Sequence, residues 1–220
     1  MFQLTTINAL RSAVMPGVSS QRPVDQVTTR MGVCLQLREL QARDADAFRR
    51  FVDGLSHASR RMRFHVSTPV GDAQAGLVCG AGRPGGPTAQ TWVWSLAHDP
   101  DQVVGEVCVA FSPAPDDAAV QTVELGIVVA DDHQRQGVGL RSVKFVQGLA
   151  RRRGVTAVKG TLLSHNRAVV GLLEQCQFEL ARDVNDPGLV HAVWRRSEAW
   201  FDDEATPSAW QRLVSRMAGL

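Results

Sequence analysis

An apolar run that carries one carboxylate and a glycine-rich turn lie close together in residues 123–139 (VELGIVVADDHQRQGVG). The carboxylate, Glu124, is the one charge in an apolar run typical of a strand, and Gln134-x-x-Gly137-x-Gly139 follows a polar turn. A segment with helical spacing comes next. Glycines allow the backbone to approach a ligand, and the N–H groups and dipole of a helix N-terminus attract an anion. The pattern therefore predicts a phosphate-binding turn next to a carboxylate that could move protons.

The turn differs from two common phosphate-binding motifs. No G-K-[ST] closes it, so it is not a P-loop, and the G-x-G-x-x-G of dinucleotide-binding folds is absent. What remains is Q/R-x-x-G-x-G/A after a strand, and this resembles the pyrophosphate-binding signature of the GNAT-type N-acetyltransferases. The resemblance implies acetyl-coenzyme A as co-substrate, with its pyrophosphate on the backbone amides of residues 134–140.

A helix is predicted directly after the turn, and Gly154 is a natural end for it. Its apolar stripe consists of Leu140, Val143, Val146 (or Gln147), Leu149 and Ala150. Three arginines, residues 151–153, fall in its last turn. We interpret them as cations that complement the helix C-terminal dipole on a solvated face, rather than as a nucleic-acid patch.

Composition restricts the class of protein. The 220 residues suit one sizeable domain with appendages, and a formal charge of +2 is too small to indicate a nucleic-acid or membrane-surface protein. The four cysteines are dispersed without C-x-x-C spacing, which favours free thiols in a reducing compartment and argues against a zinc site. No apolar run approaches the roughly 18 residues of a spanning helix. We therefore expect a cytoplasmic protein with no metal, no nucleic-acid partner and no membrane partner, and leave the oligomeric state open.

The other elements follow from apolar periodicity and turn residues. Further helices are expected from Asp44, from Ser56 and from Asn166, where Asn is a common N-cap. The expected strands are residues 33–37, 91–97, 103–111, 120–129, 155–161, 178–182 and 189–195, with a glycine- and proline-rich loop at 80–87.

Three regions are expected along the chain. Residues 1–32 are polar and form a loose arm, and residues 33–196 form the domain. Residues 197–220 form a tail with a short amphipathic helix that begins at Thr206-Pro207. That helix packs either on its own domain, the favoured reading, or on a second subunit or a protein substrate.

The order of elements predicts an α/β (α+β) domain. Its central mixed sheet should have about six to seven strands, with helices on both faces. The strand-helix-strand unit over residues 123–161 should be a parallel crossover. This order resembles that of the GNAT fold over roughly residues 33–196.

Three segments make the resemblance more specific, to one group within the GNAT-type acetyltransferases. Residues 55–64 (LSHASRRMRF) resemble the L-S-x-x-S-R-x-x-R-F segment of the acetyltransferase domain in bacterial Pat-type protein lysine acetyltransferases. Residues 123–139 resemble their strand and turn, and residues 160–168 resemble their G-x-x-L-x-x-N segment. Thr161 and His165 depart from the acidic residues often found there. The resemblance implies that the acceptor is a protein lysine.

Glu124 is the candidate catalytic residue. A lysine ammonium has a pKa of about 10.4, so the amine must lose a proton before it attacks a thioester. On a strand, Glu124 shares a face with Gly126 and Val128, which leaves space beside it. From spacing alone, a carboxylate in a cross-strand pair is an equal alternative. The resemblance favours the catalytic role, because it places the Pat-type catalytic glutamate at this position.

The predicted contacts of the cofactor extend beyond the glycines. A backbone N–H near Val128 should polarise the thioester carbonyl, and the resemblance places Asn166 beside the pantetheine arm. The full set is Val128, Val129, Gln134, Arg135, Gln136, Gly137, Val138, Gly139, Leu140 and Asn166.

The chain contains no tyrosine. Many GNAT enzymes have a tyrosine where this sequence has Leu173, as the acid that protonates the coenzyme A thiolate. Its absence agrees with the Pat-type pattern. A thiol has a pKa of about 8.5, so the thiolate can leave without a dedicated acid; water, Ser164 and Cys176 are the other candidates.

The sequence thus favours an N-acetyltransferase that moves acetyl from acetyl-coenzyme A to a primary amine by direct attack in a ternary complex. Two alternatives stay open. One is a small-molecule acetyltransferase for a polyamine, an antibiotic amine or an amino acid. The other is a non-catalytic module that binds acyl-coenzyme A.

Overall fold

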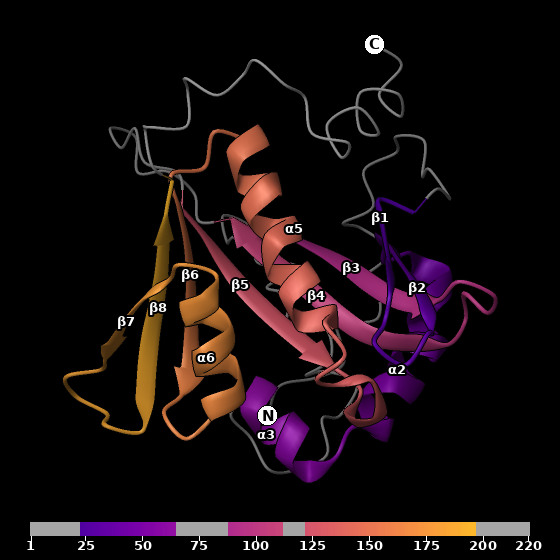
Figure 1. Ribbon diagram of the computed structural model, residues 1–220, viewed down its shortest axis with the longest axis horizontal. Helices are drawn as coiled ribbons and strands as arrows, with labels where there is room; N and C mark the ends of the chain where they lie inside the picture. The colour runs from indigo at the N-terminus through magenta and orange to yellow at the C-terminus, as the bar shows by residue number, and fades with distance from the viewer. Residues whose placement is uncertain (1–22, 65–87, 112–121, 197–220) are drawn as a thin grey trace, which may run out of the picture.

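The computed structural model describes residues 23–64, 88–111 and 122–196. The predictions for the loop at 80–87 and for the C-terminal helix lie outside these ranges. The described chain forms one mixed sheet of eight strands in the order β1-β2-β3-β4-β5-β6-β8-β7 (Figure 1). The strands are β1 Asp25–Thr28, β2 Cys34–Glu39, β3 Thr88–Leu96, β4 Val103–Phe111, β5 Thr122–Val129, β6 Ala157–Leu163, β7 Glu179–Arg182 and β8 Leu189–Arg195.

The predicted α/β fold with a mixed sheet is confirmed, but the predicted count of six to seven strands is wrong. The additional strand is β1, which pairs antiparallel with β2 although its residues were assigned to the loose arm. Its sequence, DQVT, has one aliphatic residue and no sustained alternation. Tertiary contacts stabilise it instead, since the Asp25 carboxylate accepts hydrogen bonds of 2.7 and 2.6 Å from the Arg141 guanidinium.

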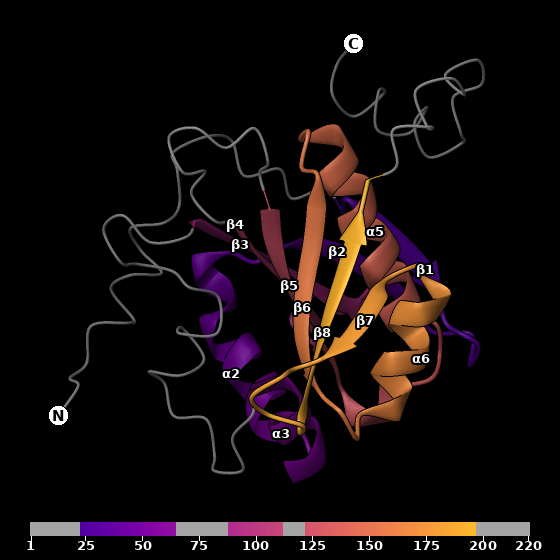
Figure 2. The ribbon, with the colours of Figure 1, turned by 90° about the vertical axis from the view of Figure 1, so that its left-hand side faces the viewer.

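Helices cover both faces of the sheet, as predicted. Figure 2 shows α2 (Ala45–Gly54) and α3 (His57–Phe64) on one face, and α5 (Val138–Arg152) and α6 (Arg167–Gln175) on the other. Two short 3-10 turns, η1 (Ala42–Asp44) and η2 (Asp131–His133), precede α2 and the glycine turn. β5 and β6 are parallel and are joined through α5, which confirms the predicted crossover.

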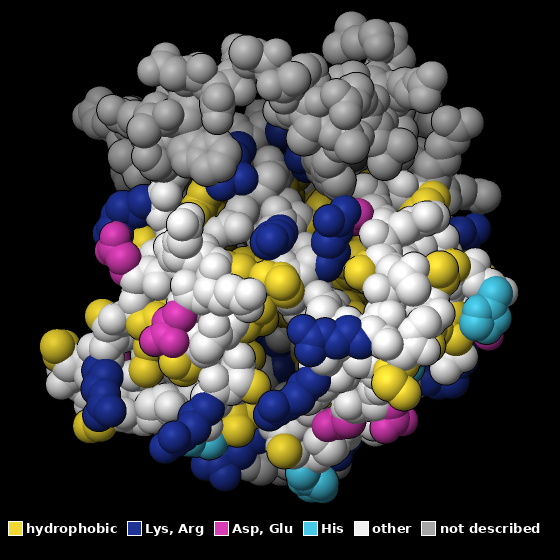
Figure 3. Space-filling model, viewed as in Figure 1, with side chains coloured by type: hydrophobic (Ala, Val, Ile, Leu, Met, Phe, Trp, Pro, Cys, Tyr) yellow, Lys and Arg dark blue, Asp and Glu magenta, His cyan; other side chains and the backbone are white. Residues whose placement is uncertain are grey.

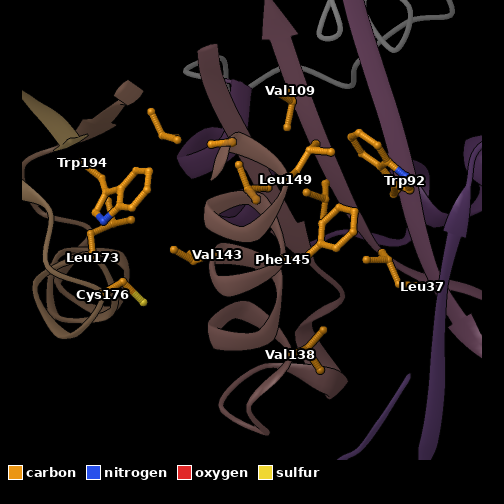
Figure 4. Packing of buried hydrophobic residues seen from close by; sticks show 14 of the residues in the cluster. Leu37, Trp92, Val109, Val138, Val143, Phe145, Leu149, Leu173, Cys176 and Trp194 are labelled. Carbon is orange, nitrogen blue, oxygen red and sulfur yellow. The ribbon is translucent and has the colours of Figure 1, made fainter. Parts of the chain in front are cut away.

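The larger core lies between the sheet and the α5–α6 face. Figure 4 shows Phe145 of α5 beside Trp92 of β3. Their ring centroids are 5.2 Å apart in an edge-on arrangement. The predicted stripe of α5 is buried at Val143, Val146, Leu149 and Ala150, and Gln147 is also buried, where its side-chain N–H₂ donates to the Cys176 carbonyl. Leu140 is half-buried at the cleft end of this helix.

A smaller core lies under α2. Phe48, Phe51 and Val52 pack against β-strand residues that include Val93 and Val128. Asp44 stands at the N-cap of α2, as the sequence indicated, but its side chain makes no capping bond to the helix. The carboxylate instead accepts two hydrogen bonds from Arg38, because that buried guanidinium needs an anionic partner.

Candidate active site

A cleft opens where β5 and β6 separate. The two strands are in register at Thr122 to Glu124 of β5, opposite Ala157 to Lys159 of β6, and diverge beyond that point. The space is about 760 Å³ and is lined by α3, the second half of β5, the glycine turn, the first turns of α5, the middle of β6, and α6. This volume suits a small organic ligand, and cofactor sites commonly form at such openings in a sheet.

The glycine turn has the geometry that an anion site requires. Arg135 and Gly137 have positive φ values of 58° and 95°, and Gly137 is the N-cap of α5. The N–H groups of Val138, Gly139 and Leu140 belong to the first helical turn and so have no acceptor within the helix. At Gly139 a Cβ atom would approach Leu172 Cδ2 to 3.2 Å, so a side chain there would meet α6.

The side-chain amide of Gln134 is bonded within the protein. Its amide donates at 3.0 Å to both the Val129 carbonyl and the Ser59 hydroxyl. Gln136 likewise donates to the Asp132 carbonyl at 2.7 Å. These two glutamines therefore shape the turn, and its backbone N–H groups are the parts that could bind an anion.

Asp131 connects the turn to α3. Its carboxylate accepts hydrogen bonds from the Ser56 N–H (2.9 Å), the Ser56 hydroxyl (2.7 Å) and the Ser59 hydroxyl (2.7 Å). Burial alone would raise the pKa of Asp131, but these hydrogen bonds outweigh it and hold that pKa below its usual value. Residues 75 positions apart in sequence thus form one hydrogen-bonded unit, here called the Asp131 latch, comprising Ser56, Ser59, Asp131 and Gln134.

Glu124 lines the cleft at the point where the strands separate, and its side chain is exposed. Its neighbours in the sheet are Ala110 of β4 and Lys159 of β6. The first leaves room beside the carboxylate, while the second places an ammonium-bearing side chain on the same face. The structure therefore allows both roles that the sequence left open, proton transfer and a cross-strand pair.

A buried ion pair that the sequence did not predict lies on the same face. The Glu106 side chain is fully buried, and its Oε2 lies 3.3 Å from Arg63 Nη2. The Arg63 guanidinium lies against Gly126, where an added Cβ would come within 2.5 Å of Nη2. A side chain at position 126 would therefore require this guanidinium to move. Residues 55–64 had carried the Pat-type resemblance, but no sequence signal connected Arg63 with Glu106 or Gly126.

On the α6 side of the cleft, the predicted helix N-cap at Asn166 is confirmed. Asn166 caps α6 through a 3.3 Å bond from the Val169 N–H to its side-chain oxygen, and it also lines the cleft. Leu173 is buried and lines the same space. Cys176 is a core residue, and burial raises the pKa of its thiol. Its position inside the apolar cluster disfavours it as the proton donor to the coenzyme A thiolate.

Positive charge gathers near the first turn of α5. Figure 3 shows several Lys and Arg side chains on the face of the molecule that carries α5. Arg30 and Arg135 line the cleft, although Arg30 fell in the expected loose arm. The arginines at the other end of α5 pack on aromatic rings: Arg151 lies 5.1 Å from the Trp194 centroid and Arg153 lies 5.0 Å from that of Phe111. Burial lowers the pKa of both.

Comparison with known families identifies this arrangement. The model of the acetyltransferase (GNAT) family matches residues 59–178, more than half of the chain. This range contains the cleft strands, the glycine turn and both helices of the α5–α6 face. The chain belongs to the GNAT acetyltransferase family.

Relatives and solved structures agree with this assignment. A probable N-acetyltransferase 14 from Xenopus tropicalis is 30% identical over 92 residues, which are 41% of this chain and 42% of that relative. The GNAT domain of S. lividans PAT superimposes with a TM-score of 0.66 at 18% identity, over 78% of this chain and 96% of that one. It matches the Pat-type resemblance found in the sequence.

A spermidine N-acetyltransferase from Vibrio cholerae, solved in complex with coenzyme A and spermine, has a TM-score of 0.54 at 13% identity, over 73% of this chain and 95% of that one. At these identities the solved structures establish the fold. Within the described residues, no helix is long and apolar enough to cross a membrane.

Proposed function

We propose that the protein transfers acetyl from acetyl-coenzyme A to a primary amine, and that the physiological acceptor is a lysine of a protein. The observation that carries this proposal is the opening between β5 and β6. It has the glycine turn at one end and Glu124 at the point where the strands separate. One cleft therefore contains the features needed for an anionic cofactor and for deprotonation of an amine.

The proposed reaction is direct attack in a ternary complex. The pyrophosphate binds the N–H groups at the start of α5, with Arg30 and Arg135 as nearby cations. Pantetheine extends through the opening past Asn166, and a backbone N–H near Val128 polarises the thioester carbonyl. Glu124 accepts a proton from the ammonium, directly or through one water. The free amine attacks the carbonyl carbon, the C–S bond breaks, and coenzyme A leaves as a thiolate.

The charge of α3 supports a protein acceptor over a polyamine. This helix, HASRRMRF, contains three arginines and no acidic residue. Arg63 lines the cleft and is paired with Glu106, so Arg60 and Arg61 supply the excess positive charge beside the cleft. A polyamine carries several positive charges and would be repelled at this wall. A lysine flanked by acidic residues would be attracted, because it presents one ammonium among carboxylates. A small amine that carries its own carboxylate, such as an amino acid, is the second candidate on the same grounds.

A direct test is acetyl transfer to a matched panel: spermidine, free lysine, a peptide with one lysine among glutamates, and the same peptide with glutamines. We expect the acidic peptide to react fastest and spermidine slowest.

Gly139→Glu should lose coenzyme A binding in calorimetry, because a side chain and a negative charge enter the anion site. Gly171→Glu, at an open position on α6, is the matched control. Binding of acetyl-coenzyme A without transfer to any acceptor would refute the enzymatic proposal and support an acyl-coenzyme A sensor.

A further inference from the structure

Three polar side chains from three segments form a hydrogen-bonded chain beside the cleft. The Thr161 hydroxyl on β6 lies 3.3 Å from His191 Nδ1 on β8, and His191 Nε2 lies 2.6 Å from Asp183 Oδ2 after β7. The other carboxylate oxygen of Asp183 accepts the N–H groups of Asn185 (2.7 Å) and Asp186 (2.9 Å), which fixes its orientation. This series is a hydroxyl, an imidazole and an orienting carboxylate, the order found in proton-transfer chains.

The hydroxyl end of this chain opens into the cleft. Thr161 lines the same space as Glu124 and is two residues along β6 from Lys159, the partner of Glu124 in the sheet. Because side chains alternate along a strand, Lys159 and Thr161 face the same side, and His191, opposite Thr161, shares that side. The face is the one that α3 covers, where the acceptor amine would enter. The imidazole is 46% exposed, so its far side reaches solvent.

The geometry defines the direction in which a proton can move. Asp183 Oδ2 can only accept when ionised, so neutral His191 donates from Nε2 and keeps an unprotonated Nδ1 toward Thr161. The Thr161 hydroxyl then donates to Nδ1, and its oxygen keeps lone pairs that can accept a proton from a group in the cleft. The hydrogen bond from His191 lowers the pKa of Asp183, followed by those from the Asn185 and Asp186 N–H groups, so the carboxylate remains ionised at neutral pH.

We propose that Thr161, His191 and Asp183 form a proton relay that carries the acceptor's ammonium proton out of the cleft. This inference rests on the proposed acetyl transfer. The ammonium gives a proton to Thr161 Oγ1 while the Thr161 hydroxyl gives its own proton to His191 Nδ1. The amine becomes neutral, the hydroxyl is restored, and His191 becomes an imidazolium stabilised by Asp183. The imidazolium then releases the proton to solvent from its exposed side.

The relay complements Glu124 rather than replacing it. An ammonium that becomes an amide loses two protons, and Glu124 and the relay each take one of them. Other charged groups on this face are Lys159 on β6, the Glu179–Arg195 pair on β7 and β8, and the Arg63–Glu106 pair between α3 and β4. The His191 ring itself is hydrogen-bonded to Thr161 and Asp183.

The test is the pH profile of kcat/KM for acetyl transfer, measured on the full chain with the acidic lysine peptide. His191→Gln and Thr161→Val should each lower kcat/KM about tenfold or more at neutral pH, and the loss should shrink as pH rises and free amine accumulates. Thr161→Ser keeps the hydroxyl and should restore the wild-type profile. Asp183→Asn should resemble His191→Gln. His98→Gln, a histidine on the β3–β4 turn, is the control for loss of an exposed imidazole.

Coenzyme A affinity and melting temperature should stay at wild-type values in all relay variants, because these side chains lie at the acceptor end. An active wild type with an unchanged profile in His191→Gln would overturn the relay and leave the acetyltransferase proposal intact. Equal losses in Thr161→Ser and Thr161→Val would also overturn it, because the hydroxyl would then have no role. A wild type that binds acetyl-coenzyme A and acetylates no amine would overturn the proposed function and the relay together.

Discussion

The position of Glu124 fits two roles, proton transfer in the cleft and a cross-strand pair in the sheet. It is exposed, it lines the cleft, and its neighbour on β6 is Lys159. If it is the proton acceptor, Glu124→Gln should bind coenzyme A normally and transfer acetyl about 10²-fold more slowly in a single turnover at neutral pH. The loss should shrink at high pH, because the amine is then deprotonated without a base. Glu174→Gln, at an exposed position on α6, is the matched control.

The opposite result would assign Glu124 to the sheet. If the single-turnover rate of Glu124→Gln equals that of the wild type, the carboxylate serves only as a cross-strand partner of Lys159. A lower melting temperature with an unchanged rate would support the same reading. Measuring both the single-turnover rate and the melting temperature of Glu124→Gln therefore distinguishes the two roles.

Among the elements, α3 and the glycine turn are coupled through the Asp131 latch. Asp131→Asn keeps the shape of the side chain but removes the charge that accepts three hydrogen bonds, so we expect a loss of about 1 kcal/mol in stability, reduced by solvent screening. We also expect weaker coenzyme A binding, because Gln134 shares Ser59 with this carboxylate. Urea unfolding and calorimetry measure the two effects. Asp132→Asn, the adjacent exposed residue, is the control.

The latch also has a defined pH dependence. The folded-state pKa of Asp131 is lowered from 3.8, so the unfolded chain takes up the proton first as pH falls. Its contribution to stability is therefore complete above about pH 4 and is lost as pH falls through the folded pKa. Asp131→Asn should be less sensitive to acid in this range. Identical acid limbs in the variant and the wild type would show that the latch contributes no stability.

Local sequence patterns predicted the secondary-structure elements more accurately than the tertiary contacts between them. The strand at residues 103–111 and the hairpin strands were found nearly to the residue, because apolar runs between turn residues are encoded locally. β1 was missed, because four residues with one aliphatic side chain carry no period. The latch and the Arg63–Glu106 pair were missed for a different reason. Each joins segments far apart in sequence, and only the folded sheet brings them together.

The candidate site divides in the same way. The glycine turn and Glu124 lie within one 17-residue stretch, so spacing and resemblance were enough to select them. The walls of the cleft come from α3, β6 and α6, and their residues could be placed only through the topology of the sheet. In the sequence, Thr161 was distinguished only by its departure from the Pat-type pattern. Its connection to His191 and Asp183 became visible only with β8 between β6 and β7.

At the scale of the whole molecule, a buried ion pair fixes the α2 layer to β2 of the sheet. Arg38 on β2 and Asp44 before α2 have side chains 5% and 2% exposed, joined by bonds of 2.6 and 3.0 Å. Arg38 also donates to the Pro100 carbonyl at 2.9 Å, and Asp44 accepts the Gln41 N–H at 2.8 Å. The pair thus connects β2, the β3–β4 turn and the start of α2, and neither Arg38 nor Asp44 lines the cleft.

Removal of one member should therefore destabilise the fold without altering the chemistry. Arg38→Met leaves the Asp44 carboxylate buried without its cation, and we expect a loss of about 3–5 kcal/mol in the free energy of unfolding. Arg195→Met breaks the exposed pair with Glu179 and should cost about 0–1 kcal/mol, since solvent screens that pair. Urea titration of both variants measures the difference, and coenzyme A affinity of the folded Arg38→Met protein should match the wild type. Equal losses in the two variants would mean that water reaches Asp44 and that the α2 layer is held by its apolar contacts alone.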